Sequence, residues 1–286
     1  MELRYLTDAD RPAIHATVLR AFADYEAPVD FDRPRLERLM ARRSTDLTAS
    51  VGAFEKGEMV AVMATAVREF EGVSSAYDVF TGVIDEYRGR GLAGQLFDKA
   101  RHLLVGRGVH RFILEVIRSN DSAIRAYERA GFATRRLLRC YEISAHELLD
   151  TPDPEGVRLQ IAAGPPATDY RSWRSWGPSW QNSDDSIDQT VEEVCWIHAC
   201  VGEECVGYAV LVPVARDLPQ LVVREDWRRR GIGRALLRAA TARIEPDQPL
   251  RVINVDEASG PDNTLFARFA ARELPPQHEM ELDFEA

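Results

Sequence analysis

The chain has 286 residues, of which 45% are apolar and 29% charged, and it carries a formal net charge of −10. This composition is typical of a soluble globular protein, and the length suits two ordinary domains. No apolar run reaches the roughly 18 residues that a membrane helix needs, so we expect no membrane partner. The absence of a basic stripe with interleaved aromatic residues argues against nucleic-acid binding. The first residues lack a signal segment, which favours a cytoplasmic location.

The four cysteines do not form a CxxC pair. Cys195, Cys200 and Cys205 lie five residues apart in strand-like sequence, where an odd spacing alternates between the two faces of a sheet. We therefore expect buried free thiols and no metal site.

The first half predicts the order β-α-α-β-β-β-α-β-α-β. Thr7 to Asp10 resembles a helix cap, and Gly57 and its neighbours resemble a hairpin turn between two apolar runs. Expected strands cover residues 2–6, 50–54, 59–67, 77–84, 112–117 and 137–143, and expected helices cover residues 7–23, 31–42, 92–105 and 121–130.

Residues 150–156 are rich in proline and acidic residues, which predicts a linker between a domain at 1–149 and a second at 157–286. The second half restarts the same order, with an abbreviated helical region. Trp173, Trp176 and Trp180 are spaced for one helical face there, where they would form core or line an aromatic pocket. Expected strands cover residues 157–161, 195–201, 206–214, 221–223, 250–255 and 280–284, and expected helices cover 232–244 and 262–271.

One short loop occurs in both halves. Arg88-Gly89-Arg90-Gly91-Leu92-Ala93 returns as Arg228-Arg229-Arg230-Gly231-Ile232-Gly233, each copy between a strand-like run and an amphipathic helix. A glycine turn that leads into a helix presents unpaired backbone N–H groups and the positive end of the helix dipole. This arrangement favours a bound diphosphate.

Two other phosphate-binding interpretations fit less well. A nucleotide-hydrolysing P-loop needs a Gly-Lys-Ser/Thr ending, which neither copy has. Gly89-x-Gly91-x-x-Gly94 satisfies the dinucleotide fingerprint, and Glu115 could serve as its ribose-binding acid. However, the second copy lacks the third glycine, because Arg234 stands at that position and Ala235 follows it. Each loop also follows several hairpin-like strands rather than the first strand.

Both loop copies match Arg/Gln-x-x-Gly-x-Gly/Ala, and the chain resembles two tandem domains of the GCN5-related N-acetyltransferase (GNAT) superfamily. In the first half, Asn120-Asp121-Ser122-Ala123, Tyr127 and Gly131-Phe132 match the family's further signature. The resemblance implies an α/β (α+β) fold of two GNAT-like domains, each with a mixed, mostly antiparallel sheet flanked by helices.

The resemblance also implies acetyl-CoA, or another short acyl-CoA, as the cofactor. Backbone N–H groups of the loop would hold its diphosphate, while the arginine side chains would mostly face solvent or the 3′-phosphate. The strand before the loop would splay from its neighbour, and a main-chain N–H near Val83 would polarise the thioester carbonyl. The expected cofactor-binding residues are Val83, Arg88, Gly89, Arg90, Gly91, Leu92, Ala93 and Asn120.

Tyr127 occupies the position at which the family protonates the departing thiolate, although it could instead be a core aromatic. The general base is open among four carboxylates. A carboxylate inside an apolar strand is costly unless it is paired or functional, which points first to Asp78 and then to Glu115. Asp85 and Glu86 fall in the turn, where solvated or capping roles explain them.

The second half keeps the loop and loses the acid. Aligning Asp262 with Asn120 places Phe269 opposite Tyr127, and a phenyl ring cannot donate a proton. The second domain is therefore expected to be degenerate or non-catalytic. Its possible second cofactor site comprises Val223, Arg228, Arg229, Arg230, Gly231, Ile232 and Gly233.

The sequence thus predicts an acetyl-CoA-dependent N-acyltransferase with its active site in the first domain. The acetyl group would pass by direct attack to a primary amine on a small molecule or peptide that the sequence does not identify. A non-catalytic acyl-CoA-binding or sensing protein is the alternative, and an NAD-type oxidoreductase is a third. No sequence pattern indicates an oligomeric state.

Overall fold

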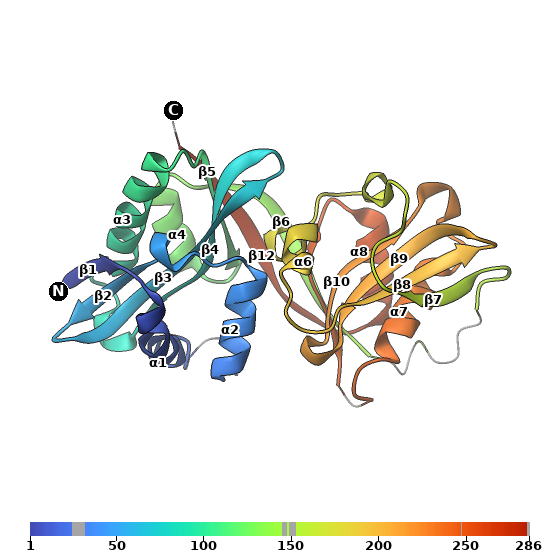
Figure 1. Cartoon of the computed structure of the whole chain (residues 1–286), viewed down its shortest axis with the longest axis horizontal. Coiled ribbons are helices and arrows are strands. Elements are labelled where there is room, and N and C mark those ends of the chain that lie inside the picture. Colours follow the sequence, from blue (N-terminus) through green and yellow to red (C-terminus); the bar gives the residue numbers. More distant parts are fainter. Residues whose placement is uncertain (25–31, 145–147, 149–152, 247, 285–286) are drawn as a thin grey trace. The chain divides into compact units, whose positions relative to one another are not determined.

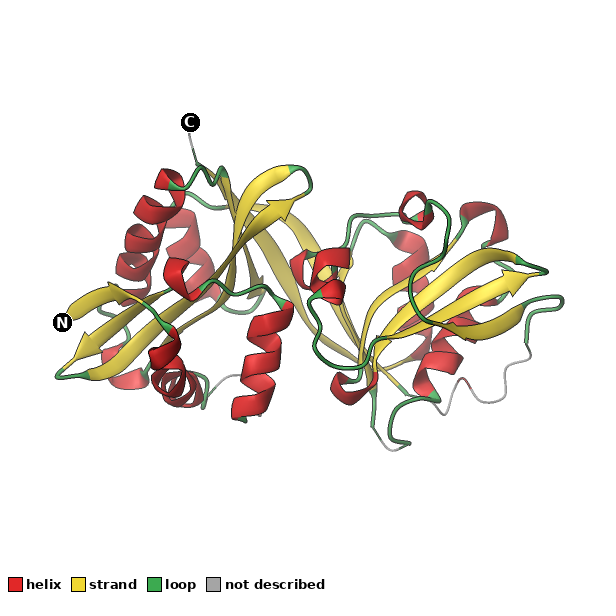
Figure 2. Ribbon diagram, viewed as in Figure 1, coloured by secondary structure: helices red, strands yellow, loops and turns green. Residues whose placement is uncertain are grey.

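The computed structural model describes residues 1–24, 32–144, 148, 153–246 and 248–284. They form two compact units. Unit 1 comprises Met1–Val116, Asn120–Arg135 and Glu279–Ala286, and unit 2 comprises Ile117–Ser119 and Arg136–His278. Each unit is a sheet with helices packed against it, which confirms the α/β fold class (Figures 1 and 2).

In unit 1 the strand order is β1-β2-β3-β4-β5-β12. Neighbours from β1 to β4 pair antiparallel, whereas β4 and β5 pair parallel. The strands are β1 (Glu2–Tyr5), β2 (Val51–Glu55), β3 (Glu58–Phe70), β4 (Val73–Val83), β5 (Arg111–Ile117) and the end of β12 (Ala270–Asp283). The helices are α1 (Arg11–Ala21), α2 (Arg33–Arg42), α3 (Leu92–Gly106) and α4 (Asp121–Arg129).

In unit 2 the order is β6-β11-β10-β9-β8-β7, and only β10 and β11 pair parallel among its registered pairs within the described residues. The strands are β6 (Ala133–Ile143), β7 (Arg158–Ala162), β8 (Cys195–Val201), β9 (Glu204–Val212), β10 (Asp217–Val223) and β11 (Leu250–Asp256). The helices are α6 (Asp184–Asp188), α7 (Ile232–Thr241) and α8 (Gly260–Phe269).

The compact units differ from the consecutive stretches 1–149 and 157–286. Most of β6, the last strand of the first repeat, belongs to unit 2, and the end of β12, the last strand of the second repeat, belongs to unit 1. β6 pairs antiparallel with β11 in unit 2. The end of β12 lies beside β5 in unit 1, where the Phe284 N–H donates to the His110 carbonyl at 2.7 Å. Residues 153–156 of the expected linker are described, and residues 150–152 lie outside the described residues.

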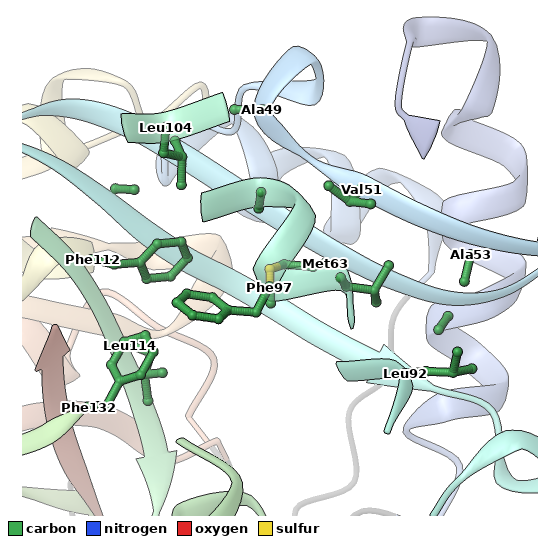
Figure 3. Close-up of a cluster of buried hydrophobic side chains, with 14 of the residues drawn as sticks. Ala49, Val51, Ala53, Met63, Leu92, Phe97, Leu104, Phe112, Leu114 and Phe132 are labelled. Carbon is green, nitrogen blue, oxygen red and sulfur yellow. The ribbon is translucent and has the colours of Figure 1, made fainter. Parts of the chain in front are cut away.

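The sheet of unit 1 buries apolar side chains on both faces. Phe97 of α3 meets Phe112 of β5 and Phe132 on one face, with ring centroids 5.4 and 5.2 Å apart (Figure 3). On the other face, α1 and α2 bury Ile14 and Leu36. Fully burying one such side chain contributes about 1.5–3 kcal/mol, so the helices hold the strand edges in a fixed position.

The tryptophans of unit 2 do not share one helical face, and that prediction is wrong. Trp173 ends a 3₁₀ turn (Tyr170–Trp173) and Trp180 begins another (Trp180–Asn182), with Trp176 in the loop between them. Pro178 interrupts the segment, because a proline disfavours helical backbone at the residue before it. Trp180 is buried in the core, as one of the two alternatives anticipated.

The expected burial of the cysteines is largely confirmed. Cys140, Cys195 and Cys200 are buried and Cys205 is partly buried, and all four are free thiols. No helix among the described residues is long and apolar enough to cross a membrane.

The dinucleotide-binding interpretation of the first loop is wrong. The loop follows β4, after three antiparallel pairings, rather than the first strand of a parallel βαβ unit. Gly94 lies within α3, in open space and at an ordinary φ, so nothing there requires a glycine.

Candidate active site

The centre of the site is the place where β4 separates from β5. Their parallel pairing covers only three residue pairs and ends at Tyr77, although β4 continues to Val83. The Ile84 N–H donates to Val60 of β3 at 3.1 Å. Because N–H groups alternate sides along a strand, the Val83 N–H points away from β3, toward the gap. The predicted splay is present, and the backbone there can pair with an extended ligand.

A β-bulge lies at the same point of β4. Phe80 pairs with Ala64 and Asp78 pairs with Thr65, so Val79 is an extra residue on β4. Residues three apart in a regular strand face opposite sides, but one inserted residue restores them to the same side. The bulge therefore brings Thr81 and Asp78 onto one face.

The loop after β4 has the backbone that its glycines predict. Gly89 and Gly91 adopt φ values of +72° and +73°, and a Cβ on either would meet no atom within 4 Å. Both glycines are therefore required for backbone conformation and not for space. Helix α3 begins at Leu92, and its first N–H groups together with the exposed loop backbone fit a diphosphate.

The arginines of this loop are exposed, as predicted, and they also support the loop itself. Arg88 donates to the carbonyls of Val83 at 3.2 Å and Ala21 at 2.8 Å. It also forms an ion pair with Asp24 at 2.6 Å, and this hydrogen bond lowers the pKa of Asp24 to about 2. Arg88 thus fastens the loop to β4 and to the end of α1.

Arg90 is exposed but engaged. Its guanidinium lies 4.7 Å from the centre of the Tyr87 ring and donates to the Glu86 carbonyl at 2.7 Å. This contact leaves the positive charge at the loop surface, where it can still attract an anion over a short range.

The structure brings together two of the predicted catalytic side chains. The Tyr127 hydroxyl on α4 donates to Asp78 Oδ2 at 3.5 Å. The Thr81 hydroxyl lies 3.0 Å and 2.9 Å from the two carboxylate oxygens of Asp78. Asp78 is only 8% exposed. Its burial raises its pKa to about 7, against the opposing effects of Thr81, Tyr127 and Arg43.

Glu115 lies on the other face of the sheet. Phe112 and Leu114 of β5 belong to the core under α3, so the alternating Glu115 points away from it. There its side chain is hydrogen-bonded to Tyr77, whose pKa is raised by burial. The two candidate bases are therefore held by different partners on different faces.

Asn120 is the N-cap of α4. Its Oδ1 accepts from the Ala123 N–H at 3.1 Å and from the Ser122 hydroxyl at 3.0 Å. Because this oxygen is committed to the helix cap, a cofactor contact would involve the amide NH2 of Asn120.

Sequence reasoning missed Thr81 and Arg43. Arg43 follows α2 and donates to the Val79 carbonyl at the bulge, at 2.9 Å. Neither residue belongs to a motif. The spacing of Asp78 and Thr81 predicts opposite faces, so only the bulge shows that they meet.

Unit 2 repeats the loop in detail. Arg228 donates to the Val223 carbonyl and to the Trp173 carbonyl, both at 2.9 Å, as Arg88 does to its own counterparts. Arg230 lies 4.4 Å from the centre of the Trp227 ring. Gly231 has φ +83°, and Arg229 adopts φ +65° at the place of Gly89. The left-handed backbone is thus kept even without the glycine.

Unit 2 also has a splay, which forms a cleft. The parallel register of β10 and β11 contains one pair, Asp217 with Arg251. The cleft encloses about 520 Å³, including space open to solvent. Its walls come from β10, β11 and α8, and from the loops that contain Trp176 and Arg228. The strands and the helix contribute mainly apolar side chains, namely Leu218, Pro219, Leu221, Val223, Val252, Val255 and Phe266.

The polar groups of the first site are absent from this second cleft. Counting back from the shared loop, Leu218 stands at the place of Asp78 and Leu221 at the place of Thr81. Counting from the helix N-caps Asn120 and Ser259, the residue opposite Tyr127 is Phe266 and not Phe269. The alignment of the two helices from sequence was therefore wrong by about one helical turn. The second domain still lacks a proton donor at this position, because Phe266 and Phe269 are both phenylalanine.

A loop closes one side of the second cleft. Asn182 donates to the Ile253 carbonyl of β11 at 2.8 Å, and Gln220 of β10 donates to the Asn182 carbonyl at 2.8 Å. Asn254, at the place of Glu115, donates to Ser179 at 3.1 Å. This loop therefore bridges the two strands that separate.

Unit 1 thus combines a glycine-ended loop beside splayed parallel strands with a phenol and a carboxylate at the splay. Residues 13–132 match the acetyltransferase (GNAT) family, and residues 192–269 match an acetyltransferase (GNAT) domain. The chain belongs to the GNAT family of acetyltransferases, with one domain of the family in each half.

Similar proteins agree with this assignment. A 52-residue segment is 44% identical to mycothiol acetyltransferase of Corynebacterium aurimucosum, covering 18% of this chain and 17% of that protein. A GNAT protein structure from Sphaerobacter thermophilus matches with TM-score 0.71 and 20% identity, covering 99% of this chain and 95% of that one. A tandem GNAT protein of the clavulanic acid biosynthesis pathway also matches with TM-score 0.71, at 14% identity, covering 99% and 98%.

The structural matches show the fold alone at these identities. The matched segments span between 17% and 48% of the lengths of three curated relatives. Activity and acceptor therefore have to be argued from this chain's own residues.

Proposed function

We propose that the protein is an acetyl-CoA-dependent N-acyltransferase whose active site lies in unit 1. The observation that carries the proposal is the contact between Tyr127 and Asp78 at the splay of β4 and β5. A proton donor and a proton acceptor stand there beside backbone groups that can hold an extended thioester. The acetyl group passes by direct attack to a primary amine of a small molecule or peptide.

The cofactor would lie along the gap-facing edge of β4, with its diphosphate on the loop. Backbone N–H groups of residues 88–93 would hold the diphosphate, and Asn120 would offer its amide NH2. The Val83 N–H is aimed into the gap and would donate to the thioester carbonyl. Acetyl-CoA would supply the activated acyl group, and the remaining steps belong to side chains of this chain.

Tyr127 would act as the acid that protonates the leaving sulfur, and Asp78 as the base that removes a proton from the amine. A carboxyl with a pKa of about 7 is ionised in part of the molecules at neutral pH and can accept a proton. Glu115 is the second candidate base, because it lies on β5 beyond the end of the pairing with β4, although on the opposite face of the sheet.

The experiment is release of free thiol from acetyl-CoA by the full chain with a panel of primary amines. We expect Y127F to lower kcat by roughly 10²–10⁴-fold with the Kd for acetyl-CoA intact. The matched control Y170F, in unit 2, should keep its activity. D78N compared with E115Q identifies the base. Failure to bind acetyl-CoA, or absence of thiol release with every amine, would overturn the proposal.

For the cleft of unit 2 we propose binding of a coenzyme A molecule without turnover. The loop geometry supports binding, whereas Leu218 and Phe266 provide neither base nor acid. This corresponds to the alternative of an acyl-CoA-binding protein, limited to one unit. Calorimetric titration should give two coenzyme A molecules per chain, falling to one in G91A and in G231A. One molecule per wild-type chain, lost in G91A, would contradict the second site.

A further inference from the structure

The acid and the base of unit 1 are in direct contact. The Tyr127 hydroxyl donates to Asp78 Oδ2 at 3.5 Å, and the Thr81 hydroxyl lies within 3.0 Å of both oxygens of the same carboxylate. The bulge at Val79 creates this arrangement, because it places Thr81 on the face of Asp78. Unit 2 has a bulge at the corresponding place, with Leu218 and Leu221 instead of the two polar residues.

The surroundings of Asp78 allow few other proton carriers. From β4 it is faced by Thr81, from α4 by Tyr127, and from the end of α2 by the positive charge of Arg43. Tyr77 and Glu115 are hydrogen-bonded to each other on the opposite face of the sheet. At 8% exposure, Asp78 exchanges protons with bulk water less readily than a surface carboxylate does.

We propose that Asp78 and Tyr127 form one proton-transfer pair, in which Asp78 receives the proton that leaves the amine and returns it to Tyr127. Thr81 is the positioning residue that holds the carboxylate of Asp78 in line with the phenol. This inference rests on the proposed acyltransferase function and deepens its account of unit 1.

The proton count balances over one reaction. The amine enters neutral, its ammonium proton having gone to solvent. As the nitrogen–carbon bond forms, an N–H bond breaks and its proton passes to a carboxylate oxygen of Asp78. As the carbon–sulfur bond breaks, the electron pair stays on sulfur, which takes the phenolic proton of Tyr127. The proton on Asp78 then moves to the phenolate oxygen, and both side chains regain their starting state.

Thr81 has two effects on the carboxylate. Its hydroxyl hydrogen bond fixes the carboxylate rotamer, and it favours the ionised form, against burial. T81V keeps the shape of the side chain and removes the hydroxyl, whereas T81S keeps the hydroxyl. The two variants separate the hydrogen bond from packing.

The first test needs no reaction. In the full chain with ¹³C-labelled aspartate, the Asp78 carboxyl is identified by its loss in D78N and titrated by NMR. We expect T81V and Y127F each to raise the pKa of Asp78, and T81S to leave it close to that of the wild type. An Asp78 carboxyl that titrates identically in Y127F and the wild type would overturn the pair.

The second test is kinetic. The base must be ionised to accept a proton, so the rise of kcat/KM with pH follows the pKa of Asp78. This rise should occur at higher pH in T81V than in the wild type, and at the wild-type pH in T81S. At neutral pH, T81V should lower kcat on the order of 10-fold, the effect of one hydrogen bond to a charged group, with KM for acetyl-CoA unchanged. A uniform loss of activity without a shift in the pH of this rise would indicate a structural role only.

A double-mutant cycle completes the test. If the two residues act as one unit, D78N/Y127F should lose about as much activity as the more damaging single variant. Multiplying losses would show independent roles and contradict the pair. If no amine is acetylated, the proposed function fails, and the NMR titration still decides whether Asp78 and Tyr127 are coupled.

Discussion

The carboxylate of Asp78 receives a hydrogen bond from Tyr127 at 3.5 Å, across the gap between β4 and α4. These residues are 49 positions apart, and the bulge and splay of β4 bring them together. Unit 2 has the same backbone features, with leucine and phenylalanine at the two positions. These backbone features are thus present twice, whereas a carboxylate and a phenol occupy the two positions only in unit 1.

The first prediction concerns stability and pH. Burial raises the pKa of Asp78 from its ordinary value of 3.8 to about 7, so between these pH values the folded state holds the extra proton. The free energy of unfolding should therefore fall as pH rises from about 4 to about 7, by on the order of 4 kcal/mol at most. Urea unfolding of wild type and D78N at pH 5 and pH 8 measures this. An identical pH dependence in D78N would contradict the assigned burial.

The second prediction compares two glycines of the first loop. G91A forces an L residue to φ +73°, which should cost roughly 1–2 kcal/mol and weaken acetyl-CoA binding. G94A, inside α3 with open space around it, should be neutral or stabilise by up to about 1 kcal/mol. Calorimetry and thermal unfolding of the two variants measure both effects. Equal damage from G94A would mean that the third glycine serves a ligand.

The third prediction concerns Arg229, which holds φ +65° where the first loop has glycine. R229G should remove the strain of this backbone conformation. The gain in stability is partly offset, because glycine has greater conformational freedom in the unfolded chain. We expect unit 2 to gain up to about 1 kcal/mol, with no effect on thiol release. Hydrogen exchange across residues 225–240 localises the change. A clear loss of protection there would show that the Arg229 side chain has a supporting contact.

The fourth prediction tests the exchanged strand. Met280 and Phe284 are 0% and 5% exposed and belong to the core of unit 1, although they end the second repeat. M280A and F284A should each destabilise unit 1 by about 2–5 kcal/mol. Limited proteolysis with mass spectrometry should show earlier cleavage within residues 1–135 than within 157–269. The opposite order would contradict the strand assignment.

Much of this fold follows from local patterns. The loop repeat, the capped helices and the alternating strands identify both domains and their order. The strand exchange does not follow from them, because β6 and the end of β12 have the same apolar pattern whichever sheet receives them. The spacing of the tryptophans predicted a helix that is not there. Three residues at helical spacing also fit a loop that contains two short 3₁₀ turns.

The residues of the site that belong to a recognisable sequence pattern could be predicted, and the others could not. Asp78 and Tyr127 stand out as a carboxylate in an apolar strand and a phenol in a family signature. Thr81 and Arg43 do not, since their roles depend on a bulge that no residue type announces. The contacts of Arg88 were also hidden, because a sequence does not show which carbonyls a guanidinium can reach.

The central claim is that the chemistry belongs to Tyr127 in unit 1. The most direct measurement is kcat for thiol release, with the acetyl-CoA Kd, in wild type, Y127F and the unit 2 control Y170F. We predict that Y127F loses roughly 10²–10⁴-fold in kcat at unchanged Kd, while Y170F matches the wild type. A wild-type kcat in Y127F would contradict the account and place the acid elsewhere.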